Sequence, residues 1–346
     1  MIDWGRSYRA LIRVFRVNAD TWQDAEQVGG IDSVSITRSC TSDAPLLESG
    51  SMSLTGDGGF ENGYYRIVMM ATQDYETERV DVATLLCEST QDVRDYGAVT
   101  PSVTCNSVLY PAHTQRMLDG SFMAPGTNGA EYAAELLRDC IKAPVMVDGA
   151  FAVSTTYWFD FGIRVIEAVW AVLGIGGFVM QIDGDGTVHI GPKPTEAALS
   201  LDEANASLLS TSVRSTLDTA KVPNRYVAKS DAVVAVAVND DPASPTSTVS
   251  RGYVYDAVDE SPATINDETL YGYAVRKLAE LSTGIADVKS YTREYWPGVR
   301  PFDIVSGSLN SVGIEGDRRV QTQTLNLAHG ILVSEQSARE VTLWQS

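Results

Sequence analysis

The segment 133–194 constrains the fold most, because it places helices and a hairpin between two regions with β-strand patterns. Its hydrophobic spacing predicts helix 133–141, which leads through the segment 144–147 to a second helix over 164–173, and then hairpin strands over 178–182 and 187–190. The turn of this hairpin is Asp183-Gly-Asp-Gly186, and Gly191-Pro-Lys-Pro194 closes the segment. The segment contains no nucleophile–base pair, no metal-ligand spacing and no phosphate-binding loop. It is therefore typical of a compact α/β insert in a scaffold.

Length and hydrophobicity limit the architecture. A chain of 346 residues is too long for one typical core, and 44% hydrophobic residues indicate globular domains, so we expect two or three of them. The longest apolar run, 165–180, is broken by Glu167 and by three glycines, which argues against a transmembrane helix. The N-terminus has no charged segment followed by an apolar one, so we expect no secretory signal and folding in a cytoplasm.

The charge of the chain excludes some partners. Acidic residues outnumber basic residues by 45 to 26, and the formal net charge is −19. Such a surface repels nucleic acid and anionic membranes. Two explanations stay open. The charge provides solubility, or acidic side chains line a channel through which DNA passes without binding to the wall.

Cysteines and histidines are few and scattered. Neither set contains a CxxC pair or another zinc-ligand spacing, so no metal site is expected. We expect the cysteines to be free and mostly buried thiols. The residues concerned are Cys40, Cys87, Cys105 and Cys140, and His113, His189 and His329.

The first ninety residues have the pattern of a small β-barrel or sandwich. The expected strands are 8–17, 33–40, 51–55, 64–72 and 79–87, with turns such as Gly56-Asp-Gly-Gly59 between them. Residues 93–128 contain three prolines and few periodic apolar positions, so we expect a connecting arm. Asn128 is predicted to cap the first helix with Glu131 as its capping-box partner. Gly174 is predicted to end the second helix in the left-handed conformation.

The last third of the chain is again rich in β-strand patterns. A helix-poor polar bridge is expected over 195–224, followed by strong β-character over 225–238. Between Asp240 and Glu268 there are seven acidic residues and one basic residue, so this loop is expected to face water or a lumen. Asn266 or Asp267 is predicted to cap a helix that ends near Leu281. The remaining expected strands are 287–295, 302–306, 320–327, 331–334 and 341–344.

Several short motifs in the sequence resemble those of binding or catalytic sites. The turn at Asp183–Gly186 resembles the start of a calcium loop, but the twelfth position is Pro194 in place of glutamate, so a hairpin turn is favoured. Gly174-Ile-Gly-Gly177 follows a helix and is not a dinucleotide fingerprint. The clusters 157–160 and 291–296 could stack on sugars, although burial in a core or interface is the commoner use of such aromatics. No Gly-x-Ser-x-Gly elbow occurs. We therefore assign no catalytic, cofactor-binding or metal-ligating residue.

The order of these parts resembles the phage tail hub family, also called baseplate hub or tail tip hub proteins, of long-tailed phages and related contractile particles. The resemblance rests on Ser33–Ile36 with Ala44-Pro-Leu-Leu-Glu-Ser-Gly-Ser51, on Ala133-Ala-Glu-Leu-Leu137 through Gly177–Gly186 to Ile190-Gly-Pro192, and on Val222–Val227, Arg251-Gly252, 267–281 and Pro301–Val305. It implies an α+β chain in which two tail-tube-like β-barrel domains are separated by an α/β insert. The implied domains are a first barrel over 1–92, an arm and insert over 93–220, and a second barrel with one helix over 221–346.

The resemblance also implies a function. Family members form a trimeric, pseudo-sixfold ring that adapts a hexameric tail tube to a threefold tip and surrounds the DNA channel. The implied partners are two further copies of the chain, a tail tube or distal tail protein, a tape measure protein, and a tip, spike or fibre protein. No enzyme activity, cofactor or membrane insertion is expected. The chain stops soon after the second barrel, whereas longer relatives carry a fibre or a hydrolase. A carbohydrate-binding adhesin that uses the aromatic clusters stays as the alternative, and a glycoside hydrolase is a third possibility.

Overall fold

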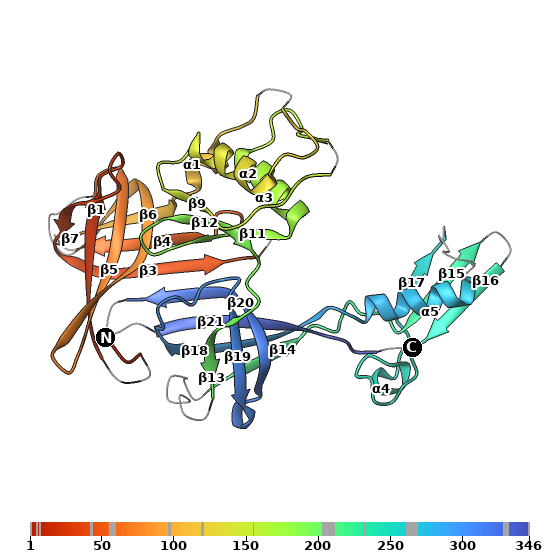
Figure 1. Ribbon diagram of the computed structural model, residues 1–346. Helices are drawn as coiled ribbons and strands as arrows, with labels where there is room; N and C mark the ends of the chain where they lie inside the picture. The colour runs from red at the N-terminus through yellow and green to blue at the C-terminus, as the bar shows by residue number, and fades with distance from the viewer. Residues whose placement is uncertain are drawn as a thin grey trace. The chain divides into compact units, whose positions relative to one another are not determined.

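A computed structural model gives the fold of the chain (Figure 1). It describes all residues except 1, 5, 7, 42–43, 55–59, 96–97, 119–120, 155, 203–211, 231–232, 261–268, 328–331 and 345–346. The chain divides into two compact units. Unit 1 comprises Met1–Val213 and Ser290–Ser337, and unit 2 comprises Arg214–Lys289 and Ala338–Ser346. The Gly56–Gly59 turn and the caps predicted at Asn266 and Asp267 lie outside the described residues.

The N-terminal part of unit 1 is an antiparallel sheet with the order β3-β4-β7-β6-β5-β1-β2. Its strands are β1 (Arg9–Val17), β2 (Asp24–Val28), β3 (Ile31–Ser39), β4 (Glu48–Leu54), β5 (Gly63–Gln73), β6 (Glu76–Asp95) and β7 (Ala98–Ser107). The five strands predicted in this region are therefore confirmed, but β6 continues to Asp95, well beyond its predicted end at Cys87, and β2 was not predicted. Alternation decides which side chains enter the core: Val14 and Ile67 are fully buried, while Arg9 and Arg13 are exposed.

Strand β7 corrects the expected connecting arm over 93–128. It pairs with both β4 and β6 and so lies inside the sheet. Val103 and Cys105, two residues apart, are buried on one face, while Thr104 between them is exposed. This period-two pattern was hidden because small polar residues and Pro101 surround it.

The expectation that all four cysteines are free is wrong for two of them. Cys87 on β6 and Cys105 on β7 are direct cross-strand partners and form a disulfide, with Cα atoms 4.4 Å apart. The pairing could not be predicted because it depends on β7. Cys40 and Cys140 are free and half-buried, and burial raises the pKa of the Cys140 thiol to about 11.

A second group of strands completes the sheet of unit 1. β20 (Ile314–Asn326) pairs antiparallel with β3 and also with β19 (Ile304–Leu309). β19 in turn pairs in parallel with β13 (Ala197–Leu201). β21 (Leu332–Val341) and β18 (Ile285–Glu294) follow β20 in the strand order, and each contains residues of both units. The described strands form an open sheet and no closed barrel. The mixed α+β class is confirmed, while the two-barrel arrangement stays a prediction.

The insert of unit 1 matches the predicted order of parts. It contains the helices α1 (Tyr110–Thr114), α2 (Gly129–Arg138) and α3 (Val165–Gly176), the sheet β11 (Phe178–Ile182), β12 (Val188–Pro192) and β9 (Val145–Val147), and the pair β8 (Phe122–Met123) and β10 (Tyr157–Trp158). Asn128 caps α2 as predicted, through a hydrogen bond from the Ala130 amide. Glu131 instead pairs with Arg138. Helix α3 ends one turn later than predicted. Its C-terminal cap in the left-handed conformation is Gly177, with φ 68°, and not Gly174 as expected.

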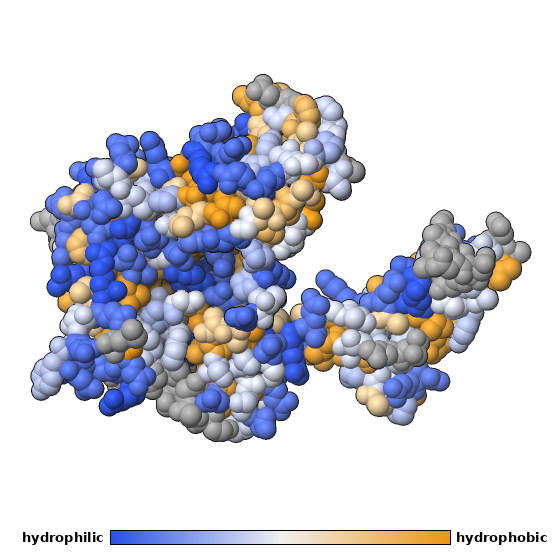
Figure 2. Space-filling view, viewed as in Figure 1, coloured by the Kyte–Doolittle hydropathy of each residue, from blue (hydrophilic) through white to orange (hydrophobic). Residues whose placement is uncertain are grey.

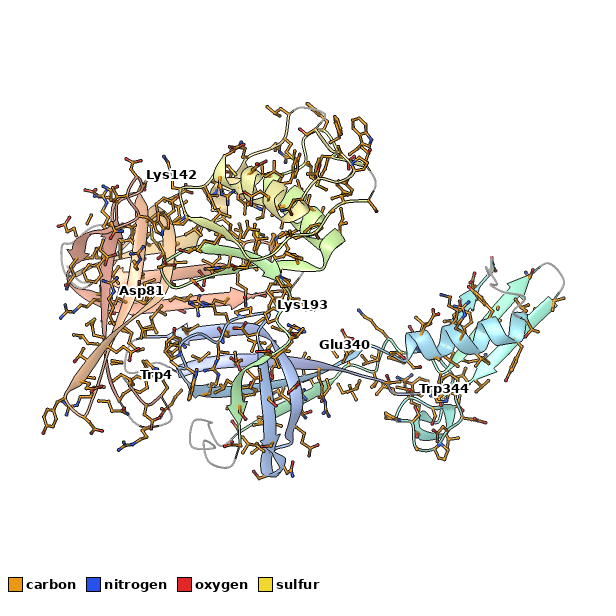
Figure 3. The ribbon with its side chains drawn as sticks, viewed as in Figure 1. Trp4, Asp81, Lys142, Lys193, Glu340 and Trp344 are labelled. Carbon is orange, nitrogen blue, oxygen red and sulfur yellow. A yellow bond between two sulfur atoms is a disulfide. The ribbon has the colours of Figure 1, made fainter. Side chains whose placement is uncertain are left out.

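Unit 2 is a small sheet with a helix on one face. The sheet has the order β16 (Val233–Val238), β15 (Arg225–Ser230) and β17 (Asp256–Asp259), and α5 (Leu270–Leu281) packs against β15 and β16. Helix α4 (Thr248–Arg251) and strand β14 (Arg214–Leu217) complete it. Thr269, and not the predicted Asn266 or Asp267, caps α5 by accepting a hydrogen bond from the Gly272 amide. Trp344, from the C-terminal segment, packs against the same core (Figure 3).

Candidate interaction sites

The strongest cluster of ionisable groups in unit 1 is fully buried. Arg293 Nη2 donates to Glu335 Oε2 at 2.6 Å, and the Tyr291 hydroxyl donates to Glu335 Oε1 at the same distance. Burial alone raises the pKa of Glu335, but Arg293 and the hydrogen bonds that the carboxylate accepts outweigh it, so this pKa is lowered. All three side chains are at most 4% exposed, so no substrate reaches them. This cluster holds the strands together and is not an active site.

The turn predicted between β11 and β12 contacts the N-terminal sheet of unit 1. The Asp185 carboxylate accepts hydrogen bonds from the Thr187 amide and hydroxyl at 2.9 and 3.0 Å, so it serves the turn. Thr84 on β6 donates to the Gly184 carbonyl at 2.9 Å, and Arg66 donates to the Asp185 carbonyl at 3.0 Å. A side chain at Gly184 would overlap the carbonyl of Asp81, which Figure 3 marks on the sheet. The hairpin turn is confirmed.

The described part of the chain has neither a metal-ligand cluster nor a helix of membrane-spanning length and hydrophobicity. There, no group of three or more His, Cys, Asp or Glu residues is arranged to hold a metal ion. No helix among the described residues is long and apolar enough to cross a membrane.

The two aromatic clusters singled out in the sequence have different environments. Tyr291 and Tyr295 are buried in unit 1, which makes that cluster part of the core. In the other cluster Phe159 is buried, whereas Trp158 is 66% exposed. The Trp158 ring lies 4.9 Å from that of Phe122, which is also exposed. The insert therefore carries one aromatic pair that a ligand could reach.

Unit 2 carries a group of exposed apolar side chains on one face of its sheet. Along β15, Tyr226 and Ala228 face α5, so Val227 points to the opposite face of the sheet. The strand register places Val236 of β16 and Val258 of β17 beside Val227. We call this surface the valine face; it consists of Val227, Val234, Val236, Val238 and Val258. Hydrophobic residues are visible near the end of β16 in Figure 2, whereas the surface over β1 to β7 is mainly hydrophilic.

The valine face has a signal in the sequence of β16. Residues 233–238 read Val-Val-Ala-Val-Ala-Val, so the larger residue alternates with alanine. Ala237 is buried in the core beneath α5, and Ala235 has the same parity along the strand, whereas Val234, Val236 and Val238 face away from the helix. Large contiguous apolar patches on folded proteins mark contacts with other molecules.

The acidic segment that begins at Asp240 is partly described. Asp240 and Asp241 are exposed, as predicted for a loop that faces water. The buried Asn239 shapes it, because its side-chain oxygen accepts from the Asp241 amide and its nitrogen donates to Ser244 at 3.0 Å. Residues 261–268 of this segment lie outside the described residues.

Comparison with known proteins identifies the fold. The chain matches no protein-family model and no curated protein sequence. Among solved structures it is similar to the 43 kDa tail protein of prophage MuSo2 from Shewanella oneidensis, with a TM-score of 0.61 at 12% identity over 96% of this chain and 98% of that one. It is also similar to a tail protein from Neisseria meningitidis, with a TM-score of 0.62 at 14% identity over 96% and 97% of the two chains.

A third similar structure is a component of the type VI secretion system of E. coli, itself described as similar to tail proteins of bacteriophage T4. Its TM-score is 0.51 at 7% identity, over 89% of this chain and 73% of that one. The chain therefore has the fold of phage tail and baseplate proteins, as the order of parts in the sequence suggested. These identities are low, so the similarity defines the fold and not the role.

Proposed function

We propose that the chain is a structural component of a phage or phage-like tail, and specifically the hub at its tip. One observation carries the proposal: a prophage tail protein and a tail protein from Neisseria meningitidis share the fold over almost the whole length of both chains. A single shared domain would leave the role of the rest open. Agreement over the insert and both β-rich regions supports one common architecture. The proposal includes no enzymatic role.

The proposed assembly is a homotrimer in which each chain contributes two tube-like domains, at 1–92 and 221–346, with the arm and insert of 93–220 between them. Six such domains form a pseudo-sixfold ring that continues a hexameric tube and ends in a threefold tip. Strand β2 is an edge of the sheet, with an unpaired row of backbone groups that invites pairing with another chain. Ring closure covers such edges between neighbouring copies.

The proposed partners are a tail tube or distal tail protein, a tape measure protein, and a tip, spike or fibre protein. The valine face is the surface we assign to one of these proteins, because an apolar face on a small sheet gains stability when a partner removes it from water. DNA passes through the ring without specific binding, and the net charge of −19 keeps it from sticking to the wall. The site of action is the tail of the particle, after assembly in the host cytoplasm.

Light scattering on the purified chain, with negative-stain images of the same sample, tests the hub. We expect a mass three times the 37.4 kDa of one chain and threefold rings with a central opening. A monomer over the whole accessible concentration range, also in the presence of a tube protein, would contradict the proposal.

A second candidate function is favoured by the exposed pair Trp158 and Phe122. Aromatic rings of this kind stack on sugars, so the insert could bind a carbohydrate of the host surface. Titration of oligosaccharides while tryptophan fluorescence is recorded tests this. Saccharide-dependent quenching that is lost in Trp158→Ala supports an adhesin, and unchanged fluorescence across a glycan panel rejects it.

A further inference from the structure

The small sheet of unit 2 has two outer edges of different character. Strands β16 and β17 lie at the two ends of the order β16-β15-β17, and neither pairs with a further strand among the described residues (Figure 1). β17 begins with Asp256 and ends with Asp259, and charged side chains are a common protection of an edge strand against pairing. β16 consists of valine and alanine alone, without charge or proline. The structure therefore leaves β16 as the unprotected edge.

The hydrogen bonds between β15 and β16 show which backbone groups of β16 are available. The Asn239 amide donates to the Asn224 carbonyl at 2.8 Å, in the same register as the pairs inside the ladder. Along an antiparallel ladder, pairs that exchange backbone hydrogen bonds alternate with pairs that do not. Counting from Asn239, three residues of β16 therefore turn their N–H and C=O groups away from β15, towards the open edge. They are Val234, Val236 and Val238.

The side chains of the same three valines belong to the valine face. A strand added at β16 would continue the backbone ladder and the apolar surface together, because its alternate side chains would lie beside these valines. In strand addition, main-chain hydrogen bonds supply affinity and alternate side chains supply specificity. The edge and the valine face are therefore suited to one extended segment with apolar residues at every second position.

Exposed charges at the two ends of β16 define the direction of such a segment. Asp240 and Asp241 follow the C-terminal end of β16 and are exposed. Lys229 of β15, which is exposed and forms no ion pair with a described residue, lies near the N-terminal end of β16. Arg225 and Asp256, at the other end of the valine face, neutralise one another. An added strand would lie two strand spacings from Lys229, about 10 Å, which long side chains can span.

We propose that β16 accepts an extended segment of another tail protein as an added antiparallel strand. The segment has a basic residue at its N-terminal end, which meets Asp240, alternating apolar residues, and an acidic residue at its C-terminal end, which meets Lys229. The inference rests on the proposed function only for the source of this segment.

A second copy of the chain fits this edge less well. Two β16 strands would pair around a twofold axis, which leaves one of the three copies of the proposed trimer without a partner. Strand β17 of a second copy has an acidic residue at each end, so one of them would lie beside Asp240. Like charges placed together suppress such a contact.

Hydrogen exchange of the full-length chain, resolved to single amides, tests the inference. The probe is a capped peptide of alternating threonine and valine, with lysine at its N-terminal end and glutamate at its C-terminal end. At a free concentration about ten times its dissociation constant, it should slow exchange of the Val234, Val236 and Val238 amides about 10-fold. The Ala235 and Ala237 amides, which bond to β15, should exchange slowly with or without the peptide.

Two changes separate strand addition from other binding. Val236→Pro removes an outward-pointing donor and leaves the bonds to β15, so it should abolish binding, since proline is tolerated on such an edge. Lys229→Glu should weaken binding about 3-fold or more, and Lys221→Glu is its matched control, with the same change of net charge at another exposed lysine of unit 2. Circular dichroism checks that each variant is folded.

A modified peptide keeps the test independent of the proline variant. N-methylation of the peptide nitrogens that face β16 removes their donors and retains every side chain, so this peptide should give no protection. Protection by the unmodified peptide alone supports the inference. Outward amides that already exchange slowly in the free chain, or no protection at about 1 mM peptide, overturn it. A trimer that does not bind the peptide overturns this inference alone, whereas a monomer that binds it supports the inference and contradicts the trimer.

Discussion

The two units of the chain place charge and apolar surface in opposite ways. Unit 1 buries ion pairs, such as Arg293–Glu335 and Arg38–Glu48, whose side chains are at most 3% exposed. Unit 2 has about a quarter of the residues but more than half of the exposed large hydrophobic side chains of the described chain. A buried ion pair fixes the strand register, because a shift of one strand would leave a buried charge without its partner. The exposed valine face adds no stability to unit 2 unless another molecule covers it. The buried ion pairs of unit 1 stabilise it from within, whereas unit 2 exposes apolar surface to solvent.

The largest effect is expected from breaking the buried pair of unit 1. Arg293→Ala leaves the Glu335 carboxylate buried without its cation, which should lower the free energy of unfolding by about 3–5 kcal/mol. Urea denaturation monitored by circular dichroism measures it. The matched control is Arg225→Ala in unit 2, whose ion pair with Asp256 is half exposed and should change stability very little. Equal effects in the two variants would remove the contrast between the units.

A close contact inside unit 1 should also be sensitive. Gly184→Ala places a methyl group against the Asp81 carbonyl, and the shift needed to relieve it should cost about 1–3 kcal/mol. Gly174→Ala is the control, because its side chain enters open space on α3 and should be neutral or slightly stabilising. Thermal unfolding of both variants gives the comparison. A neutral Gly184→Ala would show that the turn does not contact the sheet closely.

The two faces of the small sheet in unit 2 should respond differently. Ala237→Val crowds the side that faces α5 and should destabilise unit 2 by about 1–3 kcal/mol, because Ala237 is 1% exposed. Val236→Thr, on the valine face, should change stability by less than about 0.5 kcal/mol and should reduce aggregation. Trp344 is the only one of the six tryptophans that lies in unit 2, so its fluorescence reports on that unit. A large loss of stability in Val236→Thr would mean that the valine face is part of the core.

The smallest expected effect is a change in pH dependence. The pKa of Glu335 is lower in the folded chain than its ordinary value of 4.5, so the unfolded chain binds the proton more readily. The stabilisation by Glu335 is therefore complete above pH 4.5 and is lost as the pH falls towards the folded pKa. Glu335→Gln should flatten this decline when unfolding is followed between pH 5 and 3. An identical slope in wild type and variant would contradict the lowered pKa.

Much of the fold was predictable because local patterns carried it. The helices of the insert, the Asp183–Gly186 turn and most strands have strong hydrophobic periodicity or turn chemistry of their own. Strand β7 and the Cys87–Cys105 bond were missed because both depend on which strands become neighbours, information that a local pattern does not contain. The interaction surfaces were harder still. Val236 and Val258 are ordinary residues in ordinary strands, and only the register shows that they point away from the core.

Electron cryomicroscopy of the purified full-length assembly tests the central claim, a tail hub, most directly. The account predicts a ring of three chains in which six β-rich lobes surround a central opening. A compact assembly without an opening, or isolated monomers on every grid, would contradict it.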